Sequence, residues 1–442
     1  MAQQESNTKG YVLDEVLFNS NRITTPIAIQ NIVADIEIFE HLDLPYLTGQ
    51  ISFIDDNRLF DRLDIQGYET LTISLAKSQN GEPIRKTFII DKIIKSVKIN
   101  EQSEFTAVHL IEDIAYKSNL INVNKAYNGS PETIIKKILE ENLDKKLTNL
   151  SESIFQSKVK VIVPNLSPLA ATSWIKNRIT TMDGLPTYLF TTLANDDIKL
   201  IDLGKMLRQN VVNEKTPFLY GLTDHHTELT GFHHAEIYDY SLGDTEDMFD
   251  LVTKGLVGSR YDFYDAISGT YKTHNFDVSS DAFGVLEKKV DQTNSYGDFR
   301  IDEQQLHKYK SQTMSSIASS GAYDDGTSRF KSYDEEYSTS DHTKKIIGRA
   351  LKHFLLKSSI DIRVNSLGFL DKHHTTIGNK VRILFLANRP PSGTEMKLDL
   401  KKSGDYIIYS CKHTMNLSRY DMHLRCVKVS SYVDDTILKG IQ

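Results

Sequence analysis

Cysteine, tryptophan and long apolar runs are scarce in this chain of 442 residues, which has two cysteines and one tryptophan. No stretch approaches the roughly 18 consecutive apolar residues that a membrane-spanning helix needs, so no membrane insertion is expected. The N-terminus, Met-Ala-Gln-Gln-Glu-Ser-Asn, has no basic region followed by an apolar core. We therefore expect no secretory signal peptide and predict that the protein folds in a cytoplasm.

The two cysteines, Cys411 and Cys426, lie on consecutive predicted strands that are joined near residues 416–419. They could lie close together across this hairpin. Because the reducing conditions of a cytoplasm disfavour structural disulfides, we predict two buried thiols.

Positive charge is also in short supply, since 52 Lys and Arg face 59 Asp and Glu and the net charge is −7. A protein that binds nucleic acid by neutralising phosphates needs an excess of Lys and Arg, so the net charge argues against this mode of binding. The hydrophobic fraction of 39% and the charged fraction of 25% are those of an ordinary globular protein. The length predicts about two to four domains.

The most informative pattern is a set of strands that occurs twice. In each stretch apolar and polar residues alternate, as in a strand that buries one face. The first set comprises residues 34–39, 51–54, 71–75, 88–90 and 105–110, and the second comprises 235–240, 360–364, 381–385, 406–408 and 420–424. Gly67 precedes the third strand of the first set, as Gly378 precedes its counterpart. Two such sets predict two similar barrels or curled sheets; two unrelated β regions that share only the alternation are the alternative.

Helical signals appear between the two sets. Ser130-Pro131 and Ser167-Pro168 each combine a capping serine with a proline at the first helical position. The second of these helices is expected to carry Trp174, Ile175 and Ile179 and to stop at Asp183-Gly184. Residues 188–193 and 198–203 predict a hairpin around residues 195–197, and a third helix is expected from about Ser340 to Lys357.

Residues 279–340 are rich in Ser, Asp, Gly, Lys and Gln, and we interpret them as long surface excursions. They interrupt the second set after its first strand. The sequence thus predicts an α+β, mainly β protein with two similar antiparallel β-barrels and an inserted α/β middle domain built from two segments. The expected parts are a first barrel at 1–118, the first middle segment at 119–215, the opening of the second barrel at 216–250, the second middle segment with its polar excursion at 251–340, a helix and the rest of the second barrel at 341–432, and a tail at 433–442.

No motif of an enzyme stands out. The sequence has no phosphate-binding loop, and Gly258-Ser259-Arg260 lacks the second glycine of a nucleophile elbow, so it is interpreted as a strand start. The acidic doublets fall at predicted turns or near the chain end, where Asp is favoured for local hydrogen bonding. These doublets are Asp55-Asp56, Asp196-Asp197, Asp324-Asp325 and Asp434-Asp435.

Histidine pairs are the best candidates for a metal site, because imidazole is a common ligand of zinc, copper and nickel. The pairs are His225-His226, His233-His234 and His373-His374. Neighbouring residues of a strand point to opposite faces, so each pair could offer one ring to a given site. We therefore predict no catalytic, cofactor-binding or metal-binding residue.

The order of these elements resembles that of the baseplate hub proteins of contractile-tailed bacteriophages. Three blocks carry the resemblance: residues 404–413 with 420–424 resemble the closing hairpin, residues 163–168 with Trp174 and 187–202 resemble the middle domain, and residues 45–49 with 51–56 resemble the hairpin of the first barrel. The resemblance covers nearly the whole chain, although the excursion at 279–340 matches nothing in the family.

The resemblance implies a structural virion protein without catalytic residues. It implies a homotrimer whose six tail-tube-like barrels meet a six-fold tail tube, while three-fold symmetry is kept toward the central spike. The expected partners are a separate spike protein, a tube or tube-initiator protein and other baseplate proteins, with assembly in the host cytoplasm. During genome ejection, DNA would pass through the lumen without specific binding, which suits a trimer charge of −21 (3 × −7).

Three alternatives stay open at this point. The chain could be the hub of a contractile injection system, which shares the architecture. It could be a carbohydrate-active or metal-dependent tail enzyme, with converging carboxylates or a metal at residues 225–234. It could also be a receptor-binding module at the periphery of a tail.

Overall fold

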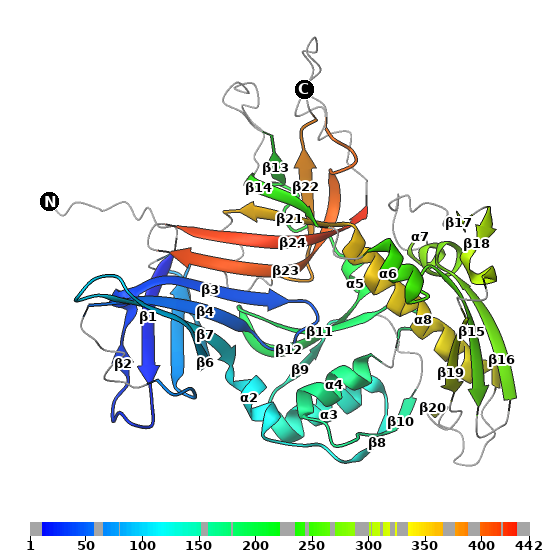
Figure 1. Ribbon diagram of the computed structural model, residues 1–442, viewed down its shortest axis with the longest axis horizontal. Helices are drawn as coiled ribbons and strands as arrows, with labels where there is room; N and C mark the ends of the chain where they lie inside the picture. Colours follow the sequence, from blue (N-terminus) through cyan, green and yellow to red (C-terminus); the bar gives the residue numbers. More distant parts are fainter. Residues whose placement is uncertain are drawn as a thin grey trace, which may run out of the picture.

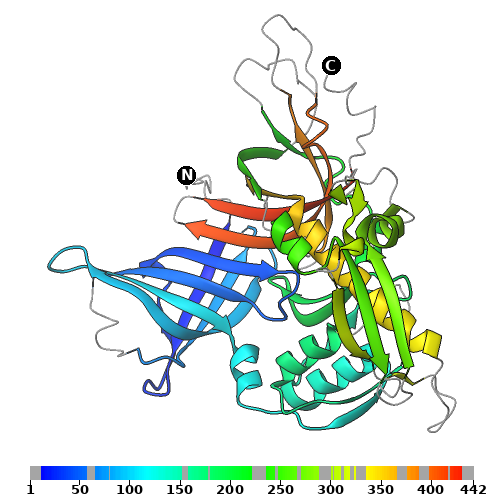
Figure 2. The same cartoon turned by 45° about the vertical axis from the view of Figure 1, so that its right-hand side comes forward.

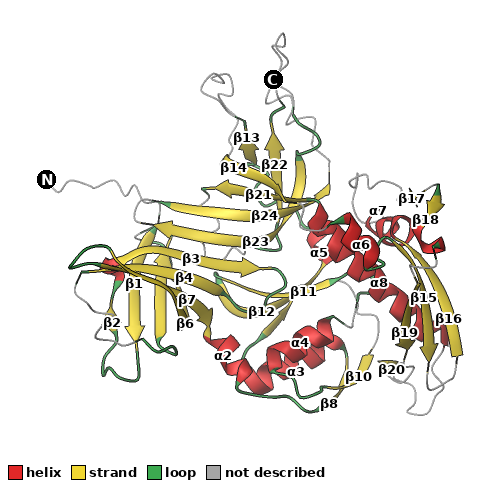
Figure 3. Cartoon of the chain, viewed as in Figure 1, coloured by secondary structure: helices red, strands yellow, loops and turns green. Residues whose placement is uncertain are grey.

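A computed structural model describes residues 11–56, 65–78, 80–151, 158–177, 180–221, 235–243, 247–265, 270–287, 300–301, 303–309, 313–318, 323–324, 335–365, 376–387, 398–416 and 419–430. The described residues form a mainly β structure with several helices. Figure 3 shows that the strands of one large sheet occupy one side of the molecule, while the helices gather on the other.

The N-terminal part of the large sheet contains only antiparallel pairs. Its strands follow the spatial order β2-β1-β5-β6-β7-β4-β3. Their bounds are β1 (Val12–Asn19), β2 (Ile27–Ala28), β3 (Val33–His41), β4 (Thr48–Asp55), β5 (Thr70–Ala76), β6 (Ile84–Lys98) and β7 (Glu104–Glu112), with the short 3₁₀ helix η1 (Gln30–Ile32) before β3. All five strands expected here are present, and β1 and β2 join them. Among the described residues no pair closes this series on itself, so it is an open sheet and not the predicted barrel.

The second part of the sheet closes into a six-stranded barrel in the order β23-β22-β13-β14-β21-β24, because β24 pairs with β23 again. Its strands are β13 (Phe218–Tyr220), β14 (Ala235–Gly243), β21 (Ser359–Val364), β22 (Lys380–Phe385), β23 (Gly404–Asn416) and β24 (Tyr420–Ser430). The prediction of an antiparallel barrel is wrong here, since β13 runs parallel to both β14 and β22. Long connections lead into and out of β13, so no tight hairpin forces it to be antiparallel.

The doubled strand pattern is visible in how the strands pair. The order β5-β6-β7-β4-β3 is repeated as β22-β23-β24-β21-β14, and every pair in both series is antiparallel. A bulge at Ala34 of β3 has a counterpart at Tyr238 of β14. A bulge at Asp91 of β6 has a counterpart at Tyr409 of β23. Bulges re-aim a strand at a defined position, so the shared bulges show that the two series agree in register around these positions. A further bulge at Ile94 of β6 has no counterpart at the equivalent Lys412 of β23.

The two glycines singled out by the sequence lie in equivalent turns but one position apart, because the counterpart of Gly378 is Tyr68, whose φ is 82°. Gly67 and Gly378 have φ angles of 90° and 78°, in the left-handed region that a side chain disfavours. Just after Gly67, the N–H of Tyr68 donates to the carbonyl of Ile90, and the N–H of Gly378 donates to the carbonyl of Ile408. Each glycine therefore turns the chain into the strand that follows.

The first middle segment packs two helices against a small sheet. Both predicted helix starts are confirmed, because α3 starts directly after Ser130 and α4 directly after Ser167, although neither serine side chain makes a capping hydrogen bond. However, α4 ends at Lys176, and Gly184 closes a separate turn by donating its N–H to Thr181. The elements are α2 (Asp113–Asn119), β8 (Ala126–Gly129), α3 (Pro131–Leu143), β9 (Leu147–Asn149), β10 (Lys158–Ile162), α4 (Pro168–Lys176), β11 (Thr187–Thr192), β12 (Asn195–Asp202) and α5 (Leu203–Arg208).

The second middle segment differs from the expected surface excursion. Phe283, Leu286 and Leu306 are buried in the main core, and β19 adds a parallel strand to β15. Apolar residues spaced within a polar stretch are sufficient to anchor it. The elements are α6 (Met248–Thr253), β15 (Gly258–Asp265), β16 (Thr270–Asp277), the π-helix η2 (Val278–Phe283), α7 (Gly284–Glu287), β17 (Arg300–Ile301), β18 (Gln304–Gln305), η3 (Leu306–Lys308), β19 (Thr313–Ala318), β20 (Tyr323–Asp324) and α8 (Glu335–Lys357).

The two middle segments meet where β20 pairs with β10. Helix α8 then crosses the molecule and leads into β21 of the barrel, as Figure 1 shows. It begins at Glu335, before the expected start near Ser340, and it ends at Lys357 as expected. Its buried residues Ala350, Leu351 and Phe354 join the core that the barrel strands share.

Candidate functional site: the continuous sheet and its polar face

The two strand sets are joined into one continuous sheet by a pairing between β3 and β23. Seven residue pairs form this internal junction, from Ser410 opposite His41 to Asn416 opposite Asp35. On the core side, Ile36, Ile38 and Met415 are each at most 1% exposed. The junction is therefore a packed interface within the chain.

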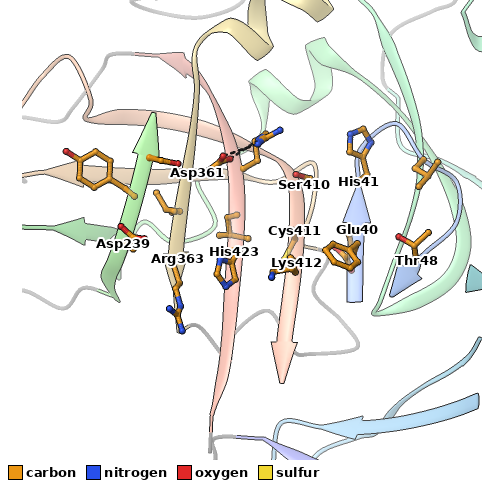
Figure 4. Close-up of a pocket in the computed structure, with 17 residues that line it drawn as sticks. Glu40, His41, Thr48, Asp239, Asp361, Arg363, Ser410, Cys411, Lys412 and His423 are labelled. Atoms are coloured by element: carbon orange, nitrogen blue, oxygen red, sulfur yellow. Dashed lines mark hydrogen bonds and ion pairs between the residues drawn. The ribbon is translucent and has the colours of Figure 1, made fainter. Parts of the chain in front are cut away.

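A groove of about 570 Å³ crosses the opposite, outward face of this sheet. Figure 4 shows the side chains that line it, which come in order from β14, β21, β24, β23, β3 and β4. They include Asp239, Asp361, Arg363, His423, Arg425, Ser410, Lys412, His41 and Thr48. Strand alternation explains the composition, because the apolar neighbours of these residues point into the core.

The charges on this face are paired between neighbouring strands. The guanidinium of Arg425 donates two hydrogen bonds to Asp361, at 2.8 and 2.9 Å. Lys412 Nζ lies 2.8 Å from Glu37 Oε1, across the internal junction. Both signs are thus interspersed among the described residues, and the negative charge of the chain is not concentrated on this face.

The two histidines of the groove are held in their neutral form. Burial lowers the pKa of His41, and its Nδ1 accepts the backbone N–H of Asp43 at 3.1 Å. Burial also lowers the pKa of His423, and the cations Lys412 and Arg363 lower it further. The groove can therefore offer neutral imidazoles and paired ions, but no uncompensated catalytic group stands out among its residues.

Beneath the groove, a buried polar cluster ties the junction to the middle segment. Glu40 Oε1 accepts the backbone N–H of Leu193, after β11, at 2.5 Å. The same oxygen lies 3.5 Å from Nε2 of His413, whose Nδ1 is 2.8 Å from the hydroxyl of Tyr420. Glu40, His413 and Tyr420 are at most 1% exposed. Because all three side chains are buried and bonded within the chain, we assign this cluster a structural role.

The cysteines behave as the sequence predicted. Cys411 and Cys426 are free and buried, on the adjacent strands β23 and β24. Burial raises the pKa of both thiols, and the negative charge of Glu40 adds to the rise at Cys411. Neither is therefore a reactive thiolate.

The acidic doublets do not form a paired-carboxylate site in the described part of the chain. Asp196 lies 2.6 Å from Lys86 Nζ, and Asp197 accepts a hydrogen bond from Thr148 at 3.0 Å. Both belong to β12, since the hairpin turn is formed by residues 193–194 rather than 195–197. Asp55 is buried at the end of β4. Asp325 and the doublet at 434–435 lie outside the described residues.

The metal candidates cannot be placed, because residues 225–226, 233–234 and 373–374 all lie outside the described residues. Within the described ranges, no group of three or more His, Cys, Asp or Glu could hold a metal ion. The same ranges contain no helix that is long and apolar enough to cross a membrane. Gly258 starts β15, as expected for a strand start.

Structural comparison reveals relatives that sequence comparison does not, since no protein-family model and no curated protein matches the sequence. The 43 kDa tail protein of prophage MuSo2 from Shewanella oneidensis matches with a TM-score of 0.50 and 9% identity, over 94% of this chain and 98% of that protein. The chain has the fold of a prophage tail protein.

Other structures give weaker matches to this tail-protein fold. The tail protein from Neisseria meningitidis MC58 matches with a TM-score of 0.49 and 11% identity, over 95% of this chain and 97% of that protein. The E. coli c3393 protein, a component of the type VI secretion system, matches with a TM-score of 0.42 and 9% identity, over 94% of this chain and 78% of that protein.

Proposed function

We propose that this chain is a structural, non-enzymatic protein of a phage tail, located in the baseplate of the virion. In this proposal it is a homotrimeric hub with two tail-tube-like β units per chain, one an open sheet and one a closed barrel, and an inserted middle domain. The hub adapts a six-fold tail tube to a three-fold central spike and forms part of the DNA channel. The tail-protein fold supports this proposal, and two exposed strand edges carry it.

The two exposed edges belong to β14 and β6, the strands that correspond to the two strands of the internal junction. By the shared order and bulges, β3 corresponds to β14 and β23 corresponds to β6. In the described residues, β6 beyond Ile90 pairs only with β7, and β14 beyond Glu236 pairs only with β21. A second copy of the β3–β23 pairing would therefore join β14 of one chain to β6 of the next.

At these edges, apolar side chains are exposed at positions whose counterparts in the internal junction are buried. Leu242 of β14 corresponds to Ile38 of β3; Leu242 is 63% exposed, whereas Ile38 is fully buried. On the other edge, Ile93 of β6 corresponds to Cys411 of β23; Ile93 is 48% exposed and Cys411 is 2% exposed. Exposed apolar side chains on an unpaired edge favour association with another chain.

Repetition of one junction would also produce the proposed symmetry. If each β unit meets the next in the same way, whether within a chain or between chains, three chains form a ring of six units related by about 60°. The polar face of the sheet would then line the ring. Its paired charges provide a surface past which DNA can move without a strongly attractive patch.

The free edge of β14 offers a direct test. Leu242→Glu places a charge where the trimer would bury an apolar side chain, so we expect the native trimer to dissociate in sedimentation analysis. The melting temperature of the separated chain should change little, because Leu242 is exposed in it.

Leu120→Glu is the matched control, since Leu120 is 71% exposed and follows α2, away from both edges. It should leave the trimer intact. A wild-type protein that stays monomeric at assembly concentrations, or a Leu242→Glu variant that remains trimeric, would refute the proposed interface.

The proposed partners require a separate test. If the chain is a hub, a tube or tube-initiator protein binds one side of the ring and a spike protein binds the other, with further baseplate proteins around it. A cryo-EM map of the particle should show the chain on the tail axis. Density for the chain at the periphery would instead favour a receptor-binding role.

A further inference from the structure

A second hollow, of about 610 Å³, lies where several parts of the chain meet. The turn after β3 contributes Asp43, the end of α4 contributes Lys176, and β15 and β23 contribute Tyr261 and Tyr409. One face of α8 forms the remaining wall. It shares no residue with the groove on the sheet.

This pocket is strongly cationic. Lys345, Arg349 and Lys352 line it from α8, and Lys176 faces them. Asp43 is the one carboxylate among the described lining residues, so the formal excess is three positive charges. Residues 345, 349 and 352 are spaced by three or four positions, which places them on one side of the helix.

The floor of the pocket is built from buried charges. The Lys176 side chain is 3% exposed and forms an ion pair with Asp43. Lys352 Nζ lies 3.2 Å from the other oxygen of Asp43 and 4.8 Å from the centre of the Tyr188 ring. The carboxylate of Asp43 thus pairs with two ammonium groups. The three partly or fully buried groups together carry one excess positive charge.

The pKa of Lys352, in the floor of the pocket, agrees with this excess of positive charge. The pKa of Lys352 is lowered to about 8: burial is the largest cause, Asp43 opposes it, and the neighbouring ammonium of Lys176 adds to the lowering. A partly buried cation in such surroundings is stabilised by an additional anion. The exposed Arg349 adds a planar group that can bind an oxyanion with two hydrogen bonds.

We propose that this pocket binds a small oxyanion, a phosphate or a carboxylate, between Arg349 and the Lys352–Lys176 floor. Tight packing behind the site holds α8 in place. A Cβ on Gly348 would lie 3.0 Å from the carbonyl oxygen of Gly184, so the helix and the loop at residues 180–186 are in close contact. The binding site therefore does not depend on assembly of the chain with other subunits.

Titration calorimetry on the full chain tests the site with sodium phosphate and, separately, sodium citrate, against sodium chloride at equal ionic strength. We expect saturable heat with at least one of the two oxyanions and none with chloride. Arg349→Gln should weaken binding by about tenfold or more, the effect of losing one charge-assisted contact. Arg349→Lys, which keeps the charge without the planar group, should recover part of the affinity.

Lys136→Gln is the control, because Lys136 is an exposed lysine of α3 with an acidic neighbour at Glu140. It should bind like the wild type. Circular dichroism checks that each variant is folded, which is expected because Arg349 is exposed. Absence of saturable binding to both oxyanions, or equal affinities of the Arg349→Gln and Lys136→Gln variants, would overturn the proposal.

Discussion

At the scale of single residues, buried charge is the feature with the clearest energetic consequences. Burial alone would raise the pKa of Asp43, but Lys352 and Lys176 hold it below its ordinary value. For Lys352, whose side chain is 24% exposed, burial outweighs the attraction of Asp43. The two partners of one ion pair therefore respond differently, because the carboxylate has two ammonium neighbours and each ammonium has one carboxylate.

Lys352 should make stability depend on pH in the alkaline range. Its pKa is about 8 in the folded chain and about 10.4 when unfolded, so the unfolded chain holds more protons between these values. The free energy of unfolding should therefore rise with pH across this window, by at most about 3 kcal/mol. Urea denaturation of the wild type and of Lys352→Met at pH 8 and pH 10 measures the contribution.

The informative quantity is the difference between the two proteins, because other lysines and tyrosines titrate in both. We expect Lys352→Met to show a smaller gain between pH 8 and pH 10. Lys136→Met, at an exposed lysine, should follow the wild type. Identical pH profiles for the wild type and Lys352→Met would contradict the lowered pKa.

At the scale of elements, strand and helix positions follow from local sequence, whereas their pairing does not. Alternation identified five strands of each set, and the Ser-Pro pairs identified the starts of α3 and α4. Strand β13 has three residues, Phe218–Tyr220, and shows no alternation. It is a strand only because β22 and β14 lie on either side of it.

Gly404, the first residue of β23, should tolerate no side chain. Its φ is 149°, and a Cβ there would collide with the carbonyl oxygen of Ser430 on β24. Gly404→Ala should therefore separate the start of this hairpin and destabilise the barrel by roughly 2 kcal/mol or more. Thermal unfolding monitored by circular dichroism provides the measurement.

Gly284→Ala offers the matched comparison, since Gly284 opens α7 and a Cβ there would meet nothing within 4 Å. Alanine favours helix by about 0.5–1 kcal/mol relative to glycine, so this variant should be neutral or slightly more stable. A Gly404→Ala variant as stable as Gly284→Ala would show that β24 can move away at little cost.

At the scale of the whole molecule, the proposed association depends on the edges of β6 and β14 that correspond to the internal junction. Figure 2 shows the light-blue ends of β6 and β7 projecting beyond the rest of the sheet. Every described residue from Asp91 to Lys98 is exposed. An isolated two-stranded hairpin is only marginally stable in water, so pairing with a strand of a neighbouring chain would stabilise this one.

Hydrogen exchange should report this association directly. In the proposed trimer, amides of residues 91–98 and 237–243 gain hydrogen-bond partners from the neighbouring chain, so their exchange should slow relative to the Leu242→Glu variant. Amides of β16 lie outside the proposed interface and should exchange alike in both proteins. Equal exchange rates at residues 91–98 would place the contact between chains elsewhere.

The polar face of the sheet could be anticipated only in part from the sequence. Alternation shows that His423 points away from the core, because its neighbours Met422 and Leu424 are apolar, whereas Lys412 lies between Cys411 and the polar His413. It does not show that Lys412 lies opposite Phe39 or that Glu37 neutralises it. These contacts join positions more than 370 residues apart along the chain, and no local pattern encodes which strands become neighbours.

The sequence by itself determined the alternating strands, the helix starts, the buried cysteines and the repetition of one strand set, because each depends on residues a few positions apart. Only the tertiary structure decided the mixed direction of the barrel, the burial of Phe283 and Leu306, and the β3–β23 junction. These depend on which surfaces meet when the whole chain minimises its exposed apolar area and pairs its backbone groups.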